Sequence, residues 1–300
     1  MVWVIGSKGM LGSEIIKQLE INQISFIGTD IEVDITNPAE LSTFATQNSN
    51  INWIINCAAY TNVDKAESEI ELAEKINATG AENIAKVAKE ISAKMIHIST
   101  DYVFDGKGKT PYTEIMKTNP TGIYGKTKEK GEKLVLQELP EAYIFRTAWL
   151  YGPRGKNFVY TMVNLMNSKE EISVVKDQIG SPTCTLDLAR YIIAVILGGQ
   201  EIPGNPHPNV YPGIYHCSGE GESSWYDFAC EIYKIGREKR IITKECTIKP
   251  CSTEDFGSRA PRPAYSVLSK SKLKKALQIK IPHWKESLRA FMASPMFKDN

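Results

Sequence analysis

Near its start the chain reads Val2-Trp-Val-Ile-Gly-Ser-Lys-Gly-Met-Leu-Gly12, an apolar run followed by three glycines at a spacing of three residues. The apolar run predicts a buried strand, and the apolar periodicity that follows predicts a helix beginning inside the glycine motif. Between a strand and a helix, small residues let the backbone approach a pyrophosphate, whose charge then lies at the helix N-terminus. Glycine turns are common, so this motif points to a binding site only because it lies between a predicted strand and a predicted helix. The stretch predicts that Gly6, Gly9 and Gly12 bind a dinucleotide.

The rest of the first half repeats this alternation of strand and helix. Five apolar runs are bounded by glycine, asparagine or aspartate, as buried parallel strands usually are: Val2–Ile5, Ser25–Gly28, Trp53–Ala58, Met95–Ser99 and Tyr143–Thr147. Asn37, followed by Pro38 and Glu40, is typical of a helix start. We therefore expect an α/β fold with a Rossmann-like doubly wound parallel sheet and right-handed crossovers.

After about residue 150 the alternation becomes less regular. We expect residues 1–150 to form an NAD(P)-binding Rossmann domain, rejoined by about residues 181–198. Residues 151–300 would form mostly a smaller C-terminal α/β domain that binds the substrate. Apolar spacing predicts one helix through Trp225 and Phe228 and another through Trp284 and Leu288. Glycine and proline gather at 198–213 and predict a long surface loop.

The composition excludes several classes of protein. Among 300 residues, 36 basic and 35 acidic side chains leave a net charge of +1, so we expect no nucleic-acid partner. The longest apolar run, Tyr191–Leu197, is far shorter than the roughly 20 residues that span a bilayer, so we expect no membrane partner. The six cysteines include no C-x-x-C pair, which favours free thiols, and no basic leader precedes the first apolar run. We expect a cytoplasmic protein.

The end of the second apolar run bears on the choice of cofactor. Asp30 lies there, about 20 residues beyond the glycine motif. A carboxylate at this position accepts hydrogen bonds from the ribose hydroxyls of the adenosine half, and no arginine follows it to hold a 2′-phosphate. We therefore expect NAD(H) to be favoured, with NADP(H) possible.

Tyr124 and Lys128 stand four residues apart in a helical stretch, which places them on one face of the helix. A neighbouring ammonium stabilises a phenolate, so the pair can act as a tuned general acid. The spacing alone is common by chance. The fourth apolar run, however, ends in Ser99-Thr100-Asp101, whose hydroxyls would reach the same carboxyl edge of the sheet. Together these motifs predict a catalytic site in which Tyr124 and Lys128 form a general acid and Thr100 binds a substrate oxygen or the tyrosine.

These motifs, in this order, resemble the extended short-chain dehydrogenase/reductase family and, within it, the dTDP-4-dehydrorhamnose reductases. The resemblance extends to about residue 289. It is carried by Cys57-Ala-Ala-Tyr-Thr-Asn-Val-Asp64, Ile98-Ser-Thr-Asp-Tyr-Val-Phe104, Ile123-Tyr-Gly-Lys-Thr-Lys128, Arg146-Thr-Ala-Trp149, Asp177-Gln-Ile-Gly-Ser-Pro-Thr183 and Arg262-Pro263. It implies an NAD(P)H-dependent oxidoreductase that reduces the 4-keto group of a nucleotide-linked 6-deoxysugar. The most specific expectation is reduction of dTDP-4-dehydro-L-rhamnose to dTDP-L-rhamnose for polysaccharide biosynthesis.

The resemblance also implies a role for individual residues. Tyr124 would donate a proton to the 4-keto oxygen, Lys128 would hold the nicotinamide ribose, and Thr100 would bind near the ketone. Asp101 and Trp149 would line the sugar site. Further positions that would contact the cofactor are Met10, Leu11, Asp34, Ile35, Ala59, Tyr60 and Thr61.

Three further expectations concern the phosphates, metals and partners. Arg262 lies on a proline-stiffened loop and is our candidate for holding the nucleotide diphosphate, since arginine matches phosphate oxygens bidentately. Some relatives bridge a dimer through a magnesium ion held by glutamates. Here Glu14 matches one of these, but Asp187 stands where another is expected, so we predict no metal. A homodimer is left open.

Two alternatives to the reductase stay open at this point. The first is another extended-family enzyme, a 4-epimerase or a 4,6-dehydratase, which retains its NAD and usually has a longer substrate domain. The second is a non-catalytic, reductase-like regulatory subunit of methionine adenosyltransferase, which resembles this chain at Asp101–Gly106. Thr100 and Trp149 favour the reductase over that subunit.

Overall fold

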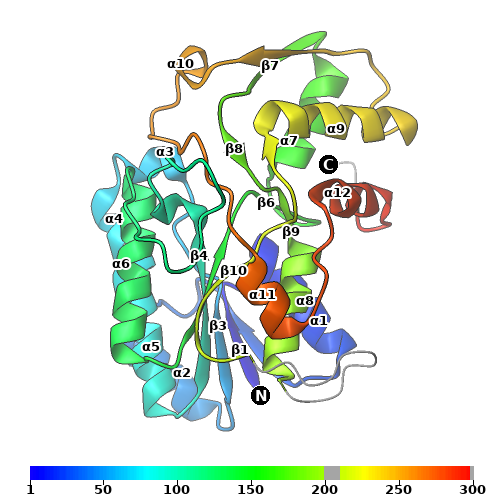
Figure 1. The fold of residues 1–300 in the computed structure, drawn as a ribbon. Helices are drawn as coiled ribbons and strands as arrows, with labels where there is room; N and C mark the ends of the chain where they lie inside the picture. The colour runs from blue at the N-terminus through cyan, green and yellow to red at the C-terminus, as the bar shows by residue number, and fades with distance from the viewer. Residues whose placement is uncertain (199–209, 298–300) are drawn as a thin grey trace.

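The computed structural model describes residues 1–198 and 210–297. Its centre is a six-stranded parallel sheet in the order β10-β5-β4-β3-β1-β2 (Figure 1). The strands are β1 (Val2–Ile5), β2 (Phe26–Thr29), β3 (Trp53–Asn56), β4 (Lys94–Thr100), β5 (Tyr143–Thr147) and β10 (Gly213–His216). The first five correspond to the five predicted runs, so the predicted doubly wound sheet is confirmed. The sixth strand, β10, comes from the second half of the chain and was not predicted.

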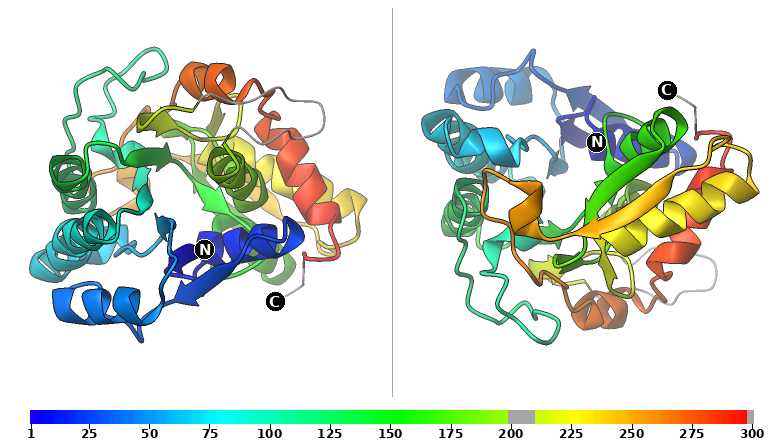
Figure 2. Two further views of the ribbon diagram at one scale, coloured as in Figure 1. Left: turned by 90° about the horizontal axis from the view of Figure 1, so that it is seen from below. Right: turned by 90° about the horizontal axis from the view of Figure 1, so that it is seen from above.

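Helices cover both faces of this sheet (Figures 1 and 2). One face packs against α1 (Met10–Ile21), α8 (Thr185–Ile196) and α11 (Ser271–Leu277). The other packs against α2 (Pro38–Gln47), α5 (Ala81–Glu90) and α6 (Ile123–Glu138). Because side chains alternate along a strand, Val2 and Val4 lie in the first layer, while Trp3 and Ile5 lie in the second. Both faces are therefore buried, which explains why the strand sequences are continuously apolar.

The helix start predicted at Asn37 is confirmed. The Asn37 side chain accepts a hydrogen bond from the backbone N–H of Ala39, and Pro38 is the first residue of α2. Shorter helical segments connect the larger elements of this half: α3 (Val63–Ala66), α4 (Ile70–Glu74), the π-helix η1 (Lys75–Gly80) and the 3₁₀-helix η2 (Asp101–Val103).

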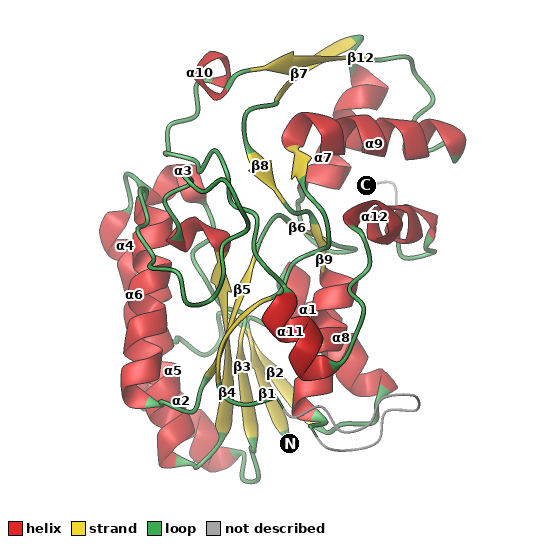
Figure 3. Cartoon of the chain, in the orientation of Figure 1, coloured by secondary structure: helices red, strands yellow, loops and turns green. Residues whose placement is uncertain are grey.

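The second half of the chain lies mainly above the carboxyl ends of the sheet strands (Figure 3). Its helices are α7 (Phe158–Ser168), α9 (Trp225–Glu238), α10 (Thr253–Phe256) and α12 (Trp284–Ala293). Its strand pairs are β7 (Glu171–Val175) with β12 (Thr247–Cys251), β6 (Leu150–Tyr151) with β9 (Thr183–Cys184), and β8 (Ile179–Gly180) with β11 (Ser223–Ser224). Tyr151, Phe228 and Trp284 belong to its separate hydrophobic core.

The helices predicted through Trp225 and Trp284 are confirmed as α9 and α12. The loop predicted at 198–213 falls mostly outside the described residues. Within residues 1–198 and 210–297, no helix is both long and apolar enough to cross a bilayer. The domain boundaries stay a prediction.

The strand order determines where a ligand can bind. From β1 the chain passes to β2 on one side and then returns past β1 to β3 on the other. In open α/β sheets the crevice at such a switch point, outside the carboxyl ends of the strands, is the usual ligand site. The glycine motif follows β1, and the segment from Cys57 follows β3. The topology therefore brings both predicted cofactor segments to one crevice.

A buried ion pair ties α6 to the sheet beneath this crevice. Arg146 on β5 donates to both carboxylate oxygens of Glu132 on α6, at 2.9 and 2.6 Å. Only 4% of each side chain is exposed. The Ser99 hydroxyl on β4 donates to the same carboxylate. Breaking such a pair on one side leaves a buried charge uncompensated.

We predict that Arg146→Met lowers the free energy of unfolding by about 3–5 kcal/mol, because the Glu132 carboxylate then stays buried without its cation. Adding Glu132→Leu should recover most of this loss, since apolar replacement of both partners removes the unpaired charge. Urea unfolding followed by circular dichroism measures both variants.

The exposed pair of Arg289 and Glu238, at 2.7 Å, provides the matched control. Solvent screens this pair, so Arg289→Met should have a much smaller effect on stability. If Arg146→Met and Arg289→Met lowered the free energy of unfolding equally, burial would not be the reason for the large effect expected at Arg146.

Candidate active site

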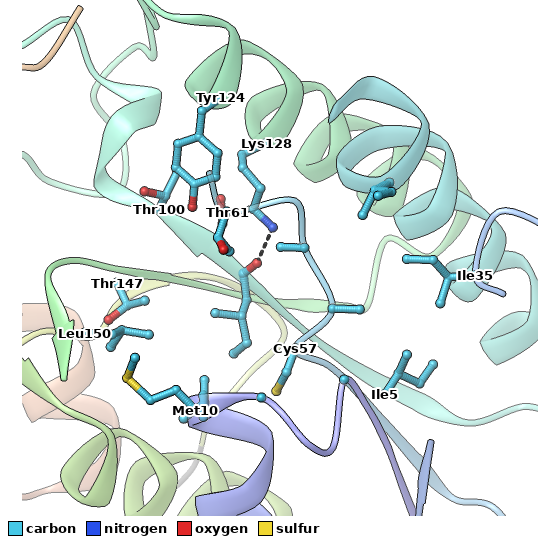
Figure 4. A pocket seen from close by; sticks show the side chains of 18 of the residues that line it. Ile5, Met10, Ile35, Cys57, Thr61, Thr100, Tyr124, Lys128, Thr147 and Leu150 are labelled. Carbon is cyan, nitrogen blue, oxygen red and sulfur yellow. Dashed lines mark hydrogen bonds between the residues drawn. The ribbon is translucent and has the colours of Figure 1, made fainter. Parts of the chain in front are cut away.

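A pocket of about 930 Å³ lies at the switch point, near the upper end of the usual size range for ligand pockets (Figure 4). Most of the predicted site residues line it: Gly6, Gly9, Met10, Leu11, Asp30, Asp34, Ile35, Ala59, Thr61, Thr100, Asp101, Tyr124, Lys128 and Trp149. Lining residues that the sequence did not single out include Lys8, Cys57, Tyr102, Thr147 and Trp225. The structure therefore brings the glycine motif, the Tyr/Lys helix and Trp149 together.

The glycine motif allows α1 to begin immediately after β1. A Cβ atom at Gly12 would lie 2.1 Å from the carbonyl oxygen of Gly6, so only glycine fits this contact. Gly9 is the N-cap of α1 and offers no side chain to its free N–H groups. The first N–H groups of a helix lack partners within the helix and attract anions. This end of the pocket is therefore suited to a pyrophosphate.

Charged groups line the rim beside the glycine motif. The Asp30 carboxylate accepts a hydrogen bond from the Lys8 backbone N–H at 3.0 Å. The Lys8 ammonium in turn pairs with Glu32 at 3.0 Å. Hydrogen bonds from Thr36 lower the pKa of Asp34, whose carboxylate accepts both the Thr36 N–H and hydroxyl. This rim of the pocket thus presents the carboxylates of Asp30 and Asp34 and the ammonium of Lys8 to an incoming ligand.

Tyr124 points into the pocket from the first turn of α6 (Figure 4). Burial raises the pKa of its phenol to about 12, while a side-chain hydrogen bond with Thr100 acts in the opposite direction. Its ring packs edge-on against Tyr102, with the ring centroids 5.5 Å apart. The phenol is therefore protonated throughout the neutral range, and its position is restricted.

Lys128 lies one turn further along α6, with only 2% of the residue exposed. Its ammonium donates to the backbone carbonyl of Ile98 at 2.7 Å, the dashed line in Figure 4. Burial lowers the pKa of Lys128 to about 8, and Glu132 counteracts part of this effect. The Lys128 ammonium, which would stabilise a phenolate, is therefore buried, and its pKa of about 8 lies close to neutral pH.

Two buried oxygens in the pocket wall have no hydrogen-bond partner among the described residues: Asp101 Oδ2 and Thr147 Oγ1. The other Asp101 oxygen accepts from the Thr100 hydroxyl at 3.0 Å. Burial raises the pKa of Asp101 to about 6. Unpartnered buried polar groups are costly, so these two oxygens indicate a polar ligand at this end of the pocket.

An aromatic pair forms the wall near the second half of the chain. The rings of Trp149 and Trp225 stack with centroids 3.6 Å apart and planes inclined by 8°. Gly180 leaves room for this stack, since a Cβ there would lie 2.5 Å from the Trp149 ring. Trp149 also has a positive φ of 48°, which is uncommon for a bulky residue. Such strain is often found at ligand sites.

Three of the predicted site residues do not line the pocket. Gly12, the last glycine of the motif, lies against the backbone of Gly6 and Ser7. The Tyr60 phenol donates to Glu69 instead, although the backbone of Tyr60 is held by the Asn77 amide. The Arg262 guanidinium pairs with Asp64 at 2.9 Å. The proposed role of Arg262 at the diphosphate therefore requires that it share or leave this carboxylate.

The two residues considered for a metal lie outside the pocket. Glu14 on α1 accepts a hydrogen bond from Gln18 at 3.1 Å, and burial raises its pKa. Asp187 on α8 accepts from the Ser287 hydroxyl at 2.6 Å. Within the described part of the chain no group of three metal-ligating side chains occurs. The expectation that this chain binds no metal stays a prediction.

Comparison with known proteins agrees with this arrangement. The family model of the RmlD substrate binding domain matches residues 1–296. A solved dTDP-4-dehydrorhamnose reductase from Clostridium acetobutylicum is 42% identical, with a TM-score of 0.87 over 97% of this chain and 98% of the other. One from Bacillus anthracis, in complex with NADP, is 38% identical, with a TM-score of 0.88 over the same shares. Spore coat polysaccharide biosynthesis protein SpsK of Bacillus subtilis is 40% identical over 97% of this chain and 96% of its own.

The family model and these relatives cover the chain almost from end to end, which confirms the resemblance expected from the motifs. The chain belongs to the RmlD family, the branch of the extended short-chain dehydrogenases/reductases that contains the dTDP-4-dehydrorhamnose reductases.

Proposed function

We propose that this chain reduces the 4-keto group of a nucleotide-linked 6-deoxysugar, with dTDP-4-dehydro-L-rhamnose as the preferred substrate. The observation that carries this proposal is one pocket lined by the glycine motif, by Tyr124 and Lys128, and by Asp101, whose Oδ2 has no hydrogen-bond partner among the described residues. A nicotinamide cofactor bound there supplies the hydride for the sugar C4. The protein has to bind the ketone, position it and provide a proton for its oxygen.

Tyr124 is the proton donor in this proposal. Its raised pKa keeps the phenol protonated at neutral pH, so a proton is available when negative charge develops on the 4-keto oxygen. After transfer, the phenolate needs a nearby positive charge. The buried Lys128 ammonium provides it, and the Thr100 side chain is the second group beside the phenol. Tyr124 would regain its proton from solvent after product release.

The other end of the pocket would recognise the sugar. Asp101 Oδ2 and Thr147 Oγ1 can bind sugar hydroxyls, which would satisfy their buried oxygens. The faces and edges of Trp149 and Trp225 present an apolar surface, which suits the C6 methyl group of a 6-deoxysugar. Arg262 remains our candidate for the diphosphate. The dimer and the cytoplasmic location remain predictions.

The cofactor choice inferred from Asp30 needs revision. The relative from Bacillus anthracis is in complex with NADP, so a preference for NAD(H) is not supported. In this chain the Lys8 ammonium lies at the same rim as Asp30, where it can meet a 2′-phosphate. We infer that the pocket accepts NADPH as well as NADH, with Lys8 favouring the former and Asp30 the latter.

The direct test of the proposed function is oxidation of NADPH and NADH with a panel of dTDP- and UDP-linked 4-keto-6-deoxysugars, with product stereochemistry determined by NMR. We expect stoichiometric oxidation with dTDP-4-dehydro-L-rhamnose. Epimerisation without net oxidation would favour the epimerase alternative. Tight binding of a methionine adenosyltransferase without any oxidation would favour the regulatory subunit.

We predict that Tyr124→Phe lowers kcat at least ~100-fold, the usual range for loss of a general acid, while the Kd for NADPH changes little. Steady-state kinetics and fluorescence titration measure the two quantities. Tyr112→Phe is the matched control, because Tyr112 is also buried but its phenol donates to Asp105 outside the pocket. Near-normal turnover in Tyr124→Phe would remove this phenol from the mechanism.

We predict that Lys8→Ala lowers the ratio of kcat/KM for NADPH to that for NADH roughly two- to fivefold, since exposed ion pairs contribute less than about 1 kcal/mol. Asp30→Ala should raise the same ratio, because the carboxylate repels a 2′-phosphate. Lys89→Ala, at the exposed end of α5, controls for loss of a surface charge. Ratios that do not change in either rim variant would place the adenosine ribose elsewhere.

A further inference from the structure

Beneath Lys128 lie two buried polar residues that the proposed mechanism does not use, Asn56 at the end of β3 and His97 in β4. Asn56 is 1% exposed and His97 is not exposed at all. The two strands pair so that these residues are direct neighbours. The Asn56 amide nitrogen lies 3.0 Å from His97 Nδ1, and His97 Nε2 lies 3.5 Å from Lys128 Nζ. These three side chains form a continuous buried row.

The orientation of the Asn56 amide follows from its other contact. The backbone N–H of Ala58 donates to Asn56 Oδ1 at 3.0 Å, so the amide oxygen must face Ala58. The amide nitrogen then faces His97, and it can only donate. His97 Nδ1 is therefore an acceptor.

The tautomer of His97 follows in turn. Burial keeps the imidazole neutral, with a pKa well below its usual value. A neutral imidazole carries one proton, so an acceptor at Nδ1 places that proton on Nε2. The Nε2–H group points toward Lys128 Nζ. An N–H facing an ammonium is a contact between two donors, whereas an N–H facing a neutral amine can donate to its lone pair.

We propose that Asn56 and His97 are positioning residues that control the charge of Lys128: the amide selects the Nε2–H tautomer, and that tautomer disfavours the ammonium. The proposal rests on the proposed function, in which the lysine charge assists Tyr124. It gives the ionisation of Lys128 a structural cause besides burial. The ammonium is present at low pH and is lost as the pH rises through the lowered pKa of about 8.

The remaining charged or titratable groups around Lys128 do not reverse this effect. The Cys57 thiol, at the end of β3, has a pKa raised to about 12 by burial and is neutral. On α6, Tyr124 is neutral as well, and the Glu132 carboxylate is engaged by Arg146 and Ser99. The Ile98 carbonyl accepts a hydrogen bond from Lys128 at 2.7 Å, and both the charged and the neutral form of the lysine can donate to it. His97 is thus the neighbour whose proton position can be changed without altering the pocket wall.

The first test is ¹⁵N NMR of the free protein labelled at histidine, with His97 assigned by comparison with His97→Gln. We expect Nε2 protonated and Nδ1 unprotonated at neutral pH. Asn56→Asp should reverse this, because a carboxylate accepts a hydrogen bond from a protonated Nδ1. A protonated Nδ1 in the unsubstituted protein would overturn the proposal. This measurement uses neither cofactor nor sugar, so its result is independent of the proposed function.

The second test is the pH profile of kcat/KM for the sugar substrate. With Nε2 free to accept, the Lys128 ammonium should persist to higher pH. The alkaline fall in activity should then move up by about one pH unit in Asn56→Asp, a tenfold change in the ionisation constant. Asn56→Ala, which removes the donor without adding a charge, should move it in the same direction and serves if Asn56→Asp does not fold.

Asn83→Asp is the matched control for burying an acid. Asn83 on α5 is 5% exposed, and its amide donates to the Ile35 carbonyl, away from Lys128. We expect it to lower stability while leaving the His97 tautomer and the alkaline limb unchanged. An alkaline limb that stays in place when the tautomer of His97 has reversed would disprove the link from His97 to Lys128.

Discussion

The contact between the Gly6 carbonyl and Gly12 is the constraint on which the crevice depends. Because Gly12 has no Cβ atom, the first turn of α1 can lie directly against the end of β1; a Cβ there would lie 2.1 Å from the Gly6 carbonyl oxygen. That approach aims the N-terminus of α1 at the switch point instead of at a solvated loop. Leu11, Ile15 and Leu19 of α1 then belong to the buried cluster formed with α8 and the sheet. A larger residue would move the helix end, and the anion site would move with it.

Burial has opposite consequences for the two groups on α6. It raises the pKa of Tyr124 and lowers that of Lys128, so in each case the neutral form is favoured. The phenol therefore keeps the proton that the proposed reaction would use. The ammonium, in contrast, is held only as long as its few neighbours accept its hydrogen bonds. In the proposed mechanism, the same burial that keeps Tyr124 protonated makes the charge of Lys128 sensitive to pH, so the position of the proton on His97 would affect that charge.

Short sequence patterns were enough to predict those features whose residues lie close together along the chain. The glycine motif, the Asn37 cap and the four-residue spacing of Tyr124 and Lys128 are all set by turn and helix geometry. Contacts between distant segments left no such signal. Trp225 appeared as an ordinary apolar residue of a helix, and only the fold brings it onto Trp149. Likewise, β10 is short, follows a glycine- and proline-rich segment, and gains its strand character by pairing with β5.

The segment after Arg259 contacts residues in both parts of the candidate site, so the two parts depend on each other. The Ala260 N–H and the Arg262 guanidinium both bind the Asp64 carboxylate on α3, which belongs to the cofactor half. A few residues later, the Ser266 side chain hydrogen-bonds Asp101. This hydrogen bond lowers the pKa of Asp101 against the effect of burial, so the ionisation of a residue in the pocket wall depends in part on a stretch more than 150 positions away in the sequence. A change in this stretch would alter the surroundings of Asp101 without replacing any residue that lines the pocket.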